Sequence, residues 1–252
     1  GSFRLLFLLR VSAMSRRKKR DQRNRSIYHR QLVLEQLEDR RMLSISSSSF
    51  EVFNSVPAMF VENQGQWEDQ SVRFAFQGSG ANVLHTDHGP VFQLFQRELV
   101  EEQLELDART SGQTRGASWA DEHQYVMQMV ELSMQFDGAA RIDPVGLDRA
   151  GTVHNYFLGE EANWLRDVPS YETVAYLGLY DGIDLMTRGQ KDSLKYEFHV
   201  APGADWRQIQ LSYEGIEGLR LDEDGDLHVQ TRFGELIDDA PFVYQEIDGQ
   251  QV

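Results

Sequence analysis

Apolar and polar residues alternate strictly in several segments of this chain after residue 50. In the cleanest case, residues 194–200, Leu, Tyr, Phe and Val alternate with Lys, Glu and His, and similar patterns occupy residues 72–76 and 131–136. Side chains of a strand point to opposite faces in turn, so this period places one face on a core and the other in water. The pattern is typical of antiparallel sheets. It predicts an all-β chain.

Asp-Gly pairs separate several of these segments, at 137–138, 181–182, 224–225 and 248–249. Glycine adopts the positive φ that tight turns require, so each pair marks a turn. Residues 219–231 make the clearest hairpin. The chain closes with a strand and an Asp-Gly turn over 243–249, and a hairpin needs a return strand. The sequence therefore predicts that the domain is truncated at its C-terminus.

One stretch, residues 97–124, interrupts the strand pattern. Residues 96–107 are rich in Glu, Leu and Gln, which favours a short helix, whereas 110–120 are rich in Gly, Ser and Thr, which favours a mobile loop. We expect a short helical or disordered insertion at the edge of the sheet. The predicted fold class is an antiparallel β-sandwich, with a large curved sheet as its variant.

The net charge changes sign near residue 45. Residues 1–45 hold 12 Lys/Arg and 4 Asp/Glu. Nearly all of the 40 Asp and Glu residues of the chain, whose net charge is −15, therefore lie after residue 45. Such a reversal separates a tail from a folded body. We predict a disordered basic leader with a Ser-rich linker over 1–49 and a β-sandwich domain over 50–252. An acidic body repels phosphates, so we do not expect that domain to bind nucleic acid.

The leader contains a short motif after its basic run. The motif comprises Leu34, Glu35, Leu37, Glu38, Arg40, Arg41, Leu43 and Ser44. It resembles the LEPR-XLL-like leader of exported planctomycete-type proteins, with Met42 at a usual Leu position. The resemblance implies export to the cell envelope or the extracellular space. The competing interpretation is a basic amphipathic helix that touches an anionic membrane or nucleic acid.

The sequence predicts no catalytic, cofactor or metal site. The chain has no Cys, which excludes disulfides and thiolate ligands, and no apolar run long enough for a transmembrane segment. Residues 85–88, His-Thr-Asp-His, offer metal-ligand types, but the following Gly-Pro favours an exposed polar turn. Asp222, Asp224 and Asp226 resemble alternating calcium ligands, but Gly225 comes too early and a solvated hairpin turn is favoured. No pair of Asp or Glu residues stands out in the sequence as the catalytic pair of a glycoside hydrolase.

The tryptophans leave carbohydrate binding open as an alternative. Trp67, Trp119, Trp164 and Trp206 are able to form a sugar-stacking platform, although such residues more often belong to strands and cores. A structure in which the tryptophans are buried removes this alternative.

Several short motifs follow one another through the body. They are Phe60–Gln66, Asn155–Gly159, Trp164–Tyr171, Tyr180–Leu185, Leu194–Ala204, Leu221–Leu227, Gly234–Leu236 and Tyr244–Gly249. In this order they resemble the uncharacterised β-rich domain that precedes SBBP-type β-propeller repeats in large exported bacterial proteins. The resemblance covers roughly 50–252 and brings no catalytic residues with it. It implies that the partners are downstream repeat domains of the same protein.

Two functions are compatible with these observations. The first is a non-catalytic module of an exported cell-surface or secreted protein, with a structural, adhesive or repeat-capping role. The second is an extracellular domain that binds or acts on carbohydrate, with surface polysaccharide as its partner; its support is analogy at the level of the fold.

Overall fold

The computed structural model describes residues 2–12, 28–31, 59–78, 80–99, 125–190, 193–247 and 250–251. Over these residues the fold is all-β, as the alternation predicts. The helices among them are two single 3-10 turns, η1 (Glu161–Asn163) and η2 (Trp206–Gln208). No helix in the described part is long and apolar enough to span a membrane.

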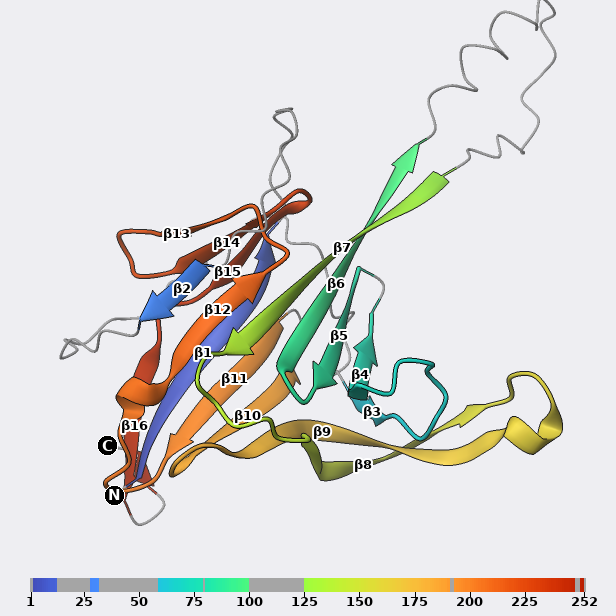
Figure 1. Ribbon diagram of the computed structural model, residues 1–252, viewed down its shortest axis with the longest axis horizontal. Helices are drawn as coiled ribbons and strands as arrows, with labels where there is room; N and C mark the ends of the chain where they lie inside the picture. Colours follow the sequence, from blue (N-terminus) through green and yellow to red (C-terminus); the bar gives the residue numbers. More distant parts are fainter. Residues whose placement is uncertain are drawn as a thin grey trace, which may run out of the picture.

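The strands form one continuous antiparallel sheet (Figure 1). Along the main path of pairings they are β13 (Gly218–Leu221), β14 (Leu227–Thr231), β15 (Gly234–Asp238), β1 (Ser2–Ser12), β11 (Ser193–Val200), β10 (Ile183–Gln190), β9 (Leu165–Tyr180), β3 (Phe60–Glu62), β4 (Val72–Gln77), β5 (Ala81–Thr86), β6 (Gly89–Leu99), β7 (Tyr125–Phe136), β12 (Gln210–Glu214) and β2 (Tyr28–Gln31). Strand β8 (Val145–Tyr156) pairs with the free side of β9, β16 (Phe242–Ile247) continues β15 along β1, and β17 (Gln250–Gln251) pairs with β16.

The sheet curls, so that strands distant along this path enclose one core. Tyr213 of β12 and Val229 of β14 are both fully buried in the same apolar cluster as Phe198 of β11. A curled sheet whose inner faces pack together is sandwich-like, as predicted. The alternation in β11 has its expected effect on one face, because Leu194, Tyr196, Phe198 and Val200 are at most 2% exposed.

The turns predicted at the Asp-Gly pairs are confirmed where the structure describes them. The 181–182 pair joins β9 to β10 directly, with Tyr180 opposite Ile183, and Gly182 has φ 71°. The hairpin predicted over 219–231 is β13–β14. The 137–138 pair also turns the chain, but it leads from β7 to β8, and these two described strands do not pair with each other. The 248–249 pair lies outside the described residues.

The helix predicted from residue 96 is wrong in its first residues. Strand β6 continues to Leu99, and it pairs with β7 out to Tyr125. A partner strand in register supplies backbone hydrogen bonds that override a weak local helix propensity. The rest of the predicted insertion, residues 100–124, lies outside the described residues. It connects the strands of one long hairpin.

Two segments of the predicted disordered leader, residues 1–49, are strands instead. Ser2–Ser12 form β1, which pairs with β11 on one side and with β15 and β16 on the other. Tyr28–Gln31 form β2, which pairs with β12. The charge reversal located a boundary in composition, but the apolar run Phe3–Leu9 has the character of a strand paired on both sides. The other residues of that range are not described.

Candidate interaction site

The export-signal motif is not placed by the structure. Its residues lie outside the described ranges: Leu34, Glu35, Leu37, Glu38, Arg40, Arg41, Leu43 and Ser44. The motif stays a prediction.

The His85–His88 segment is only partly the exposed turn that was predicted. His88 is at the surface, with Nδ1 2.6 Å from Asp87 Oδ1. His85, in contrast, is the penultimate residue of β5 and is fully buried. The two imidazoles therefore occupy different environments. Nowhere in the described part do three or more His, Asp or Glu side chains gather to hold a metal ion.

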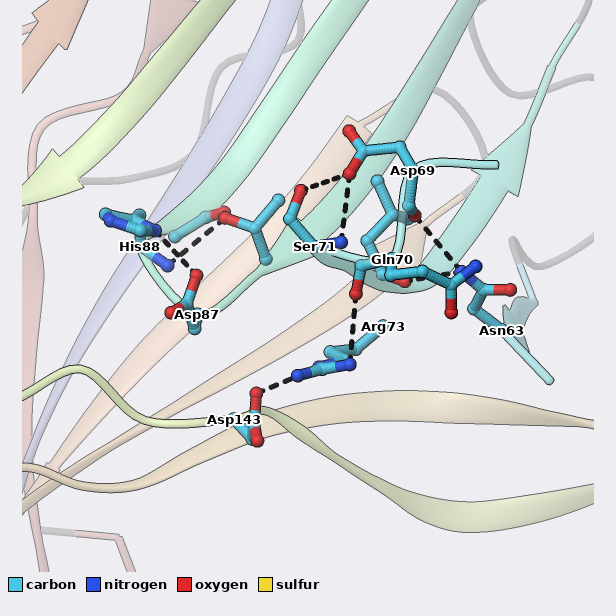
Figure 2. Close-up of polar contacts among 11 residues, drawn as sticks. Asn63, Asp69, Gln70, Ser71, Arg73, Asp87, His88 and Asp143 are labelled. Atoms are coloured by element: carbon cyan, nitrogen blue, oxygen red, sulfur yellow. Dashed lines mark hydrogen bonds and ion pairs between the residues drawn. The ribbon is translucent and has the colours of Figure 1, made fainter. Parts of the chain in front are cut away.

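The loop between β3 and β4 uses its polar groups to hold its own shape (Figure 2). The Asn63 side-chain amide donates to the Asp69 carbonyl over 3.2 Å. The Asp69 carboxylate accepts from the hydroxyl and the backbone N–H of Ser71, and these bonds lower the pKa of Asp69. Arg73, at the start of β4, has its Nε 2.9 Å from Asp143 Oδ1, which ties β4 to the segment before β8. These contacts serve folding.

The Asp222–Asp226 loop is a hairpin turn, as favoured over a calcium site. Asp222 Oδ1 accepts from the backbone N–H groups of Asp224 and Asp226, both over 3.0 Å. Its other oxygen lies 2.9 Å from Nε2 of His228, whose Nδ1 is 2.7 Å from Glu235 Oε2. Burial alone would lower the pKa of His228, but the two carboxylates outweigh it and raise the pKa above its usual value.

This pairing predicts a pH-dependent contribution to stability. Because the folded pKa of His228 is raised, its contribution is complete below the unfolded value near 6.5 and is lost as pH rises through the folded pKa. The melting temperature of His228→Gln should therefore fall below that of the wild type more at about pH 6 than at about pH 9. Thermal melts of both proteins at the two pH values check this, and an equal difference at both would contradict it.

Glu197 departs from the prediction that it faces water. Its side chain is 8% exposed, and it accepts a hydrogen bond from the hydroxyl of Tyr244 in β16. Burial alone would raise the pKa of Glu197. Bonds from His199 and Tyr244, with the charges of His199 and Lys195, outweigh burial and lower the pKa to about 2. A carboxylate held ionised by its neighbours has a structural use and is poorly suited to donate a proton.

The β8–β9 hairpin carries exposed aromatic and aliphatic side chains near its end. It projects away from the curled sheet, and its end lies far from β11 and β12 (Figure 1). Phe157 is 53% and Leu158 63% exposed. The ring of Trp164 meets Phe157 edge-on at 5.0 Å, and the Arg166 guanidinium lies 5.3 Å from the Phe157 centroid. We call Phe157, Leu158, Trp164 and Arg166 the aromatic tip.

Local backbone features fix the aromatic tip. The strands pair as far as Tyr156 opposite Leu165, and Gly159 then turns the chain with φ 68°. Trp164 Nε1 donates to the Gly159 carbonyl over 3.4 Å, across the 3-10 turn. Asn155 Oδ1 accepts from the N–H of Asp167, which has a positive φ of 56°. This bond crosses the hairpin from β8 to β9, at a register shift between the two strands.

A second aromatic pair adjoins the aromatic tip. Trp67, in the β3–β4 loop, meets Tyr156 edge-on at 6.5 Å. Trp67, Trp164 and Trp206 are each partly exposed, so burial does not remove the carbohydrate alternative. Trp119 lies outside the described residues. The sequence indicated Trp67 and Trp164 as candidate binding residues, but Phe157, Leu158 and Arg166 were not predicted. The usable signal for them was the run Phe-Leu-Gly directly after a strand.

The aromatic tip is suited to binding. Aromatic rings and Arg are enriched at binding hot spots. The rings supply large contact areas at a low cost in conformational entropy. An exposed ring face also stacks on sugars or on apolar side chains. Within the described residues, the acidic and imidazole clusters lie elsewhere and bond to their own loops and strands.

Comparison with known proteins places the chain in a family. Residues 60–252 match the family described as Domain of unknown function (DUF7948). No curated protein and no solved structure matches the chain. The matched residues contain all strands from β3 to β17 and the aromatic tip. The predicted presence of an uncharacterised β-rich domain is thereby confirmed. Since the match covers most of the chain, the protein belongs to the DUF7948 family.

Proposed function

We propose that this protein is a non-catalytic module of an exported cell-surface or secreted protein, with a structural or adhesive role, and that the aromatic tip is its contact surface. The export part rests on the likeness of Leu34–Ser44 to an envelope leader. The resemblance to domains that precede SBBP-type repeats supports a second role, in which the module caps or supports a downstream β-propeller array.

The observation that carries the adhesive role is the aromatic tip at the end of a projecting hairpin. Phe157 and Leu158 keep more than half of their surface in water, which costs free energy in proportion to apolar area. A partner that covers them recovers that free energy. The cation–π contacts of Arg166 with Phe157 and Trp164 hold the rings in place before binding, which reduces the entropy lost on contact.

The first test removes the rings. Retention of the labelled full chain on intact cells of its own source should fall at least about tenfold in the Phe157→Ala/Trp164→Ala double variant, because hot-spot aromatics typically contribute about 2 kcal/mol or more. The matched control is Trp206→Ala, since Trp206 is also partly exposed and also lies beneath an Arg. Equal retention of the double variant and the wild type, measured by flow cytometry, would refute the adhesive role of the tip.

The second candidate is a carbohydrate-binding or glycan-acting domain. The specific observation in its favour is the pair of partly exposed rings, Phe157 and Trp164, beside a cation. A glycan array distinguishes the two candidates: binding of the wild type to a defined glycan, lost in the double variant, supports carbohydrate recognition. Release of new reducing ends from a bound polysaccharide would replace the non-catalytic proposal by a hydrolytic one.

A further inference from the structure

Strand β1 fills a gap that is one strand wide. On one side it pairs antiparallel with β11 over Ser193–Val200, and on the other side with β15 over 235–238 and then with β16 over 242–246. The other neighbour of β11 is β10, and that of β15 is β14. Without β1, the edges of β11 and of β15–β16 would stand roughly 9.5 Å apart, twice the spacing of paired strands. The buried backbone groups along both edges would lose their partners.

Two hydrogen bonds, which we call the clasps, join side chains of β11 to side chains of β15 and β16 across β1, one on each face of β1. Tyr196 of β11 donates from its hydroxyl to Asp238 Oδ2 of β15 over 2.7 Å, in the core. On the opposite face, the hydroxyl of Tyr244 in β16 donates to Glu197 of β11. Consecutive residues of β11 point to opposite faces, so the two bonds pass on either side of the β1 backbone. The gap is therefore bounded by the edges of β11 and of β15–β16, and a clasp closes it on each face.

The occupant of this gap comes from outside the family domain. The family match begins at residue 60, where β3 also begins, whereas β1 ends at Ser12. Strand β2 also lies outside the match, but it only extends the sheet beside β12. Among the described strands of the family match, none stands between β11 and β15–β16. The family domain thus presents two facing edges that a segment from elsewhere completes.

We propose that β11, β15 and β16 form a strand-accepting groove, a binding site for an extended apolar peptide that runs antiparallel to all three, and that Ser2–Ser12 is its intramolecular occupant. Strand addition of this kind takes affinity from main-chain hydrogen bonds and specificity from alternate side chains. The charges within Ser2–Ser12 are Arg4 and Arg10, while the clasps contribute Glu197 and Asp238. The preferred ligand is therefore an apolar strand with isolated basic residues.

The first test uses the full chain with a protease site inserted between Ser12 and Tyr28. After cleavage, Ser2–Ser12 should stay bound and then exchange with a fluorescent synthetic peptide of the same sequence. Incorporation should be at least about tenfold greater in cleaved than in uncleaved chain, because the intact tether gives the native strand a high effective concentration. A scrambled peptide of the same composition should not be incorporated. Equal labelling of cleaved and uncleaved chain, or equal labelling by the scrambled peptide, would overturn the proposal.

The clasp gives a matched variant for the same assay. Tyr244→Phe keeps the ring and removes only the hydroxyl that donates to Glu197. Loss of one hydrogen bond to a carboxylate should speed peptide exchange about threefold to tenfold. Tyr171→Phe is the matched control, because it removes a hydroxyl that donates to Glu62 over 3.4 Å on β9, outside the groove, and it should leave the exchange rate unchanged. An unchanged rate in Tyr244→Phe would show that the clasp does not hold the occupant.

A second test needs no peptide. The chain has no native Cys, so disulfides report the register without background. The pairs Leu5→Cys/Val243→Cys and Leu6→Cys/Phe242→Cys join residues directly opposite each other in β1 and β16. At least one should form a disulfide within the chain, because alternate antiparallel pairs come close enough. Leu9→Cys/Val243→Cys, out of register, should not. Absence of any in-register disulfide, or disulfides only between chains, would overturn the intramolecular occupancy.

Discussion

Replacing Phe198 by alanine is expected to lower the free energy of unfolding by about 3–5 kcal/mol, the usual cost of a large aromatic truncation in a packed core. Phe198 is fully buried on β11, and its ring meets Phe136 of β7 at 6.0 Å and Tyr196 at 6.1 Å. Strands β7 and β11 are not neighbours along the sheet, so this contact joins two sides of the curl. Urea denaturation followed by circular dichroism measures the change.

Leu221→Ala is the matched control for this prediction. Leu221 also lies on a strand, but it is 62% exposed, so its truncation should change the free energy of unfolding by less than about 0.5 kcal/mol. A loss below about 1 kcal/mol in Phe198→Ala would contradict the position of β11 in the core.

Acidification is expected to destabilise the fold through His85. Burial holds the pKa of His85 down to about 3. Nε2 lies 3.4 Å from the Thr187 hydroxyl, and Nδ1 lies 3.2 Å from that of Tyr176. Since the Thr187 hydroxyl donates to the Val174 carbonyl, it accepts from Nε2–H, as a neutral imidazole allows. Protonation therefore favours the unfolded chain.

The pH window follows from the direction of this shift. Because the folded pKa is depressed below the unfolded value near 6.5, the stability is complete above pH 6.5 and is lost as pH falls towards about 3. The slope is about 1.4 kcal/mol per pH unit, which amounts to roughly 5 kcal/mol over the whole window. The raised pKa of His228 adds no slope below 6.5, and Glu197 contributes only below its usual value of 4.5.

The His85→Gln variant isolates this effect, since glutamine keeps hydrogen-bonding groups but does not titrate. Between about pH 6.5 and 4.5 its free energy of unfolding should change much less with pH than that of the wild type. Urea titrations at several pH values measure both slopes. Parallel curves for the two proteins would show that His85 is not buried as a neutral imidazole.

Local patterns predicted the features that depend on neighbours in sequence. The alternation of residues 194–200 fixed which side chains of β11 enter the core, and Asp181-Gly182 fixed a hairpin, because both depend on backbone geometry over a few residues. Features set by distant pairings were missed. Glu197 is covered by Tyr244, and Leu99 extends a strand because Tyr125 lies opposite it.

At the candidate site, too, features set by neighbouring residues could be predicted and features set by distant contacts could not. The run Phe-Leu-Gly after a strand gave a local signal, but the exposure of Phe157 could not be predicted from it, because that exposure depends on how far the β8–β9 hairpin extends beyond the rest of the sheet. The apolar run Phe3–Leu9 gave a local signal for a strand, yet its partners are more than 180 residues away. A basic composition nearby outweighed that signal in the prediction of a disordered leader.

The most direct test of the contact surface is amide hydrogen exchange of the full chain, with and without the envelope fraction of its source cells. If the aromatic tip is the contact surface, protection should increase over residues 157–166, with little change in β10 and β11. Protection that avoids the tip and covers another surface, such as that around Glu197 and His199, would contradict the account, as would no change at any residue in the presence of bound envelope.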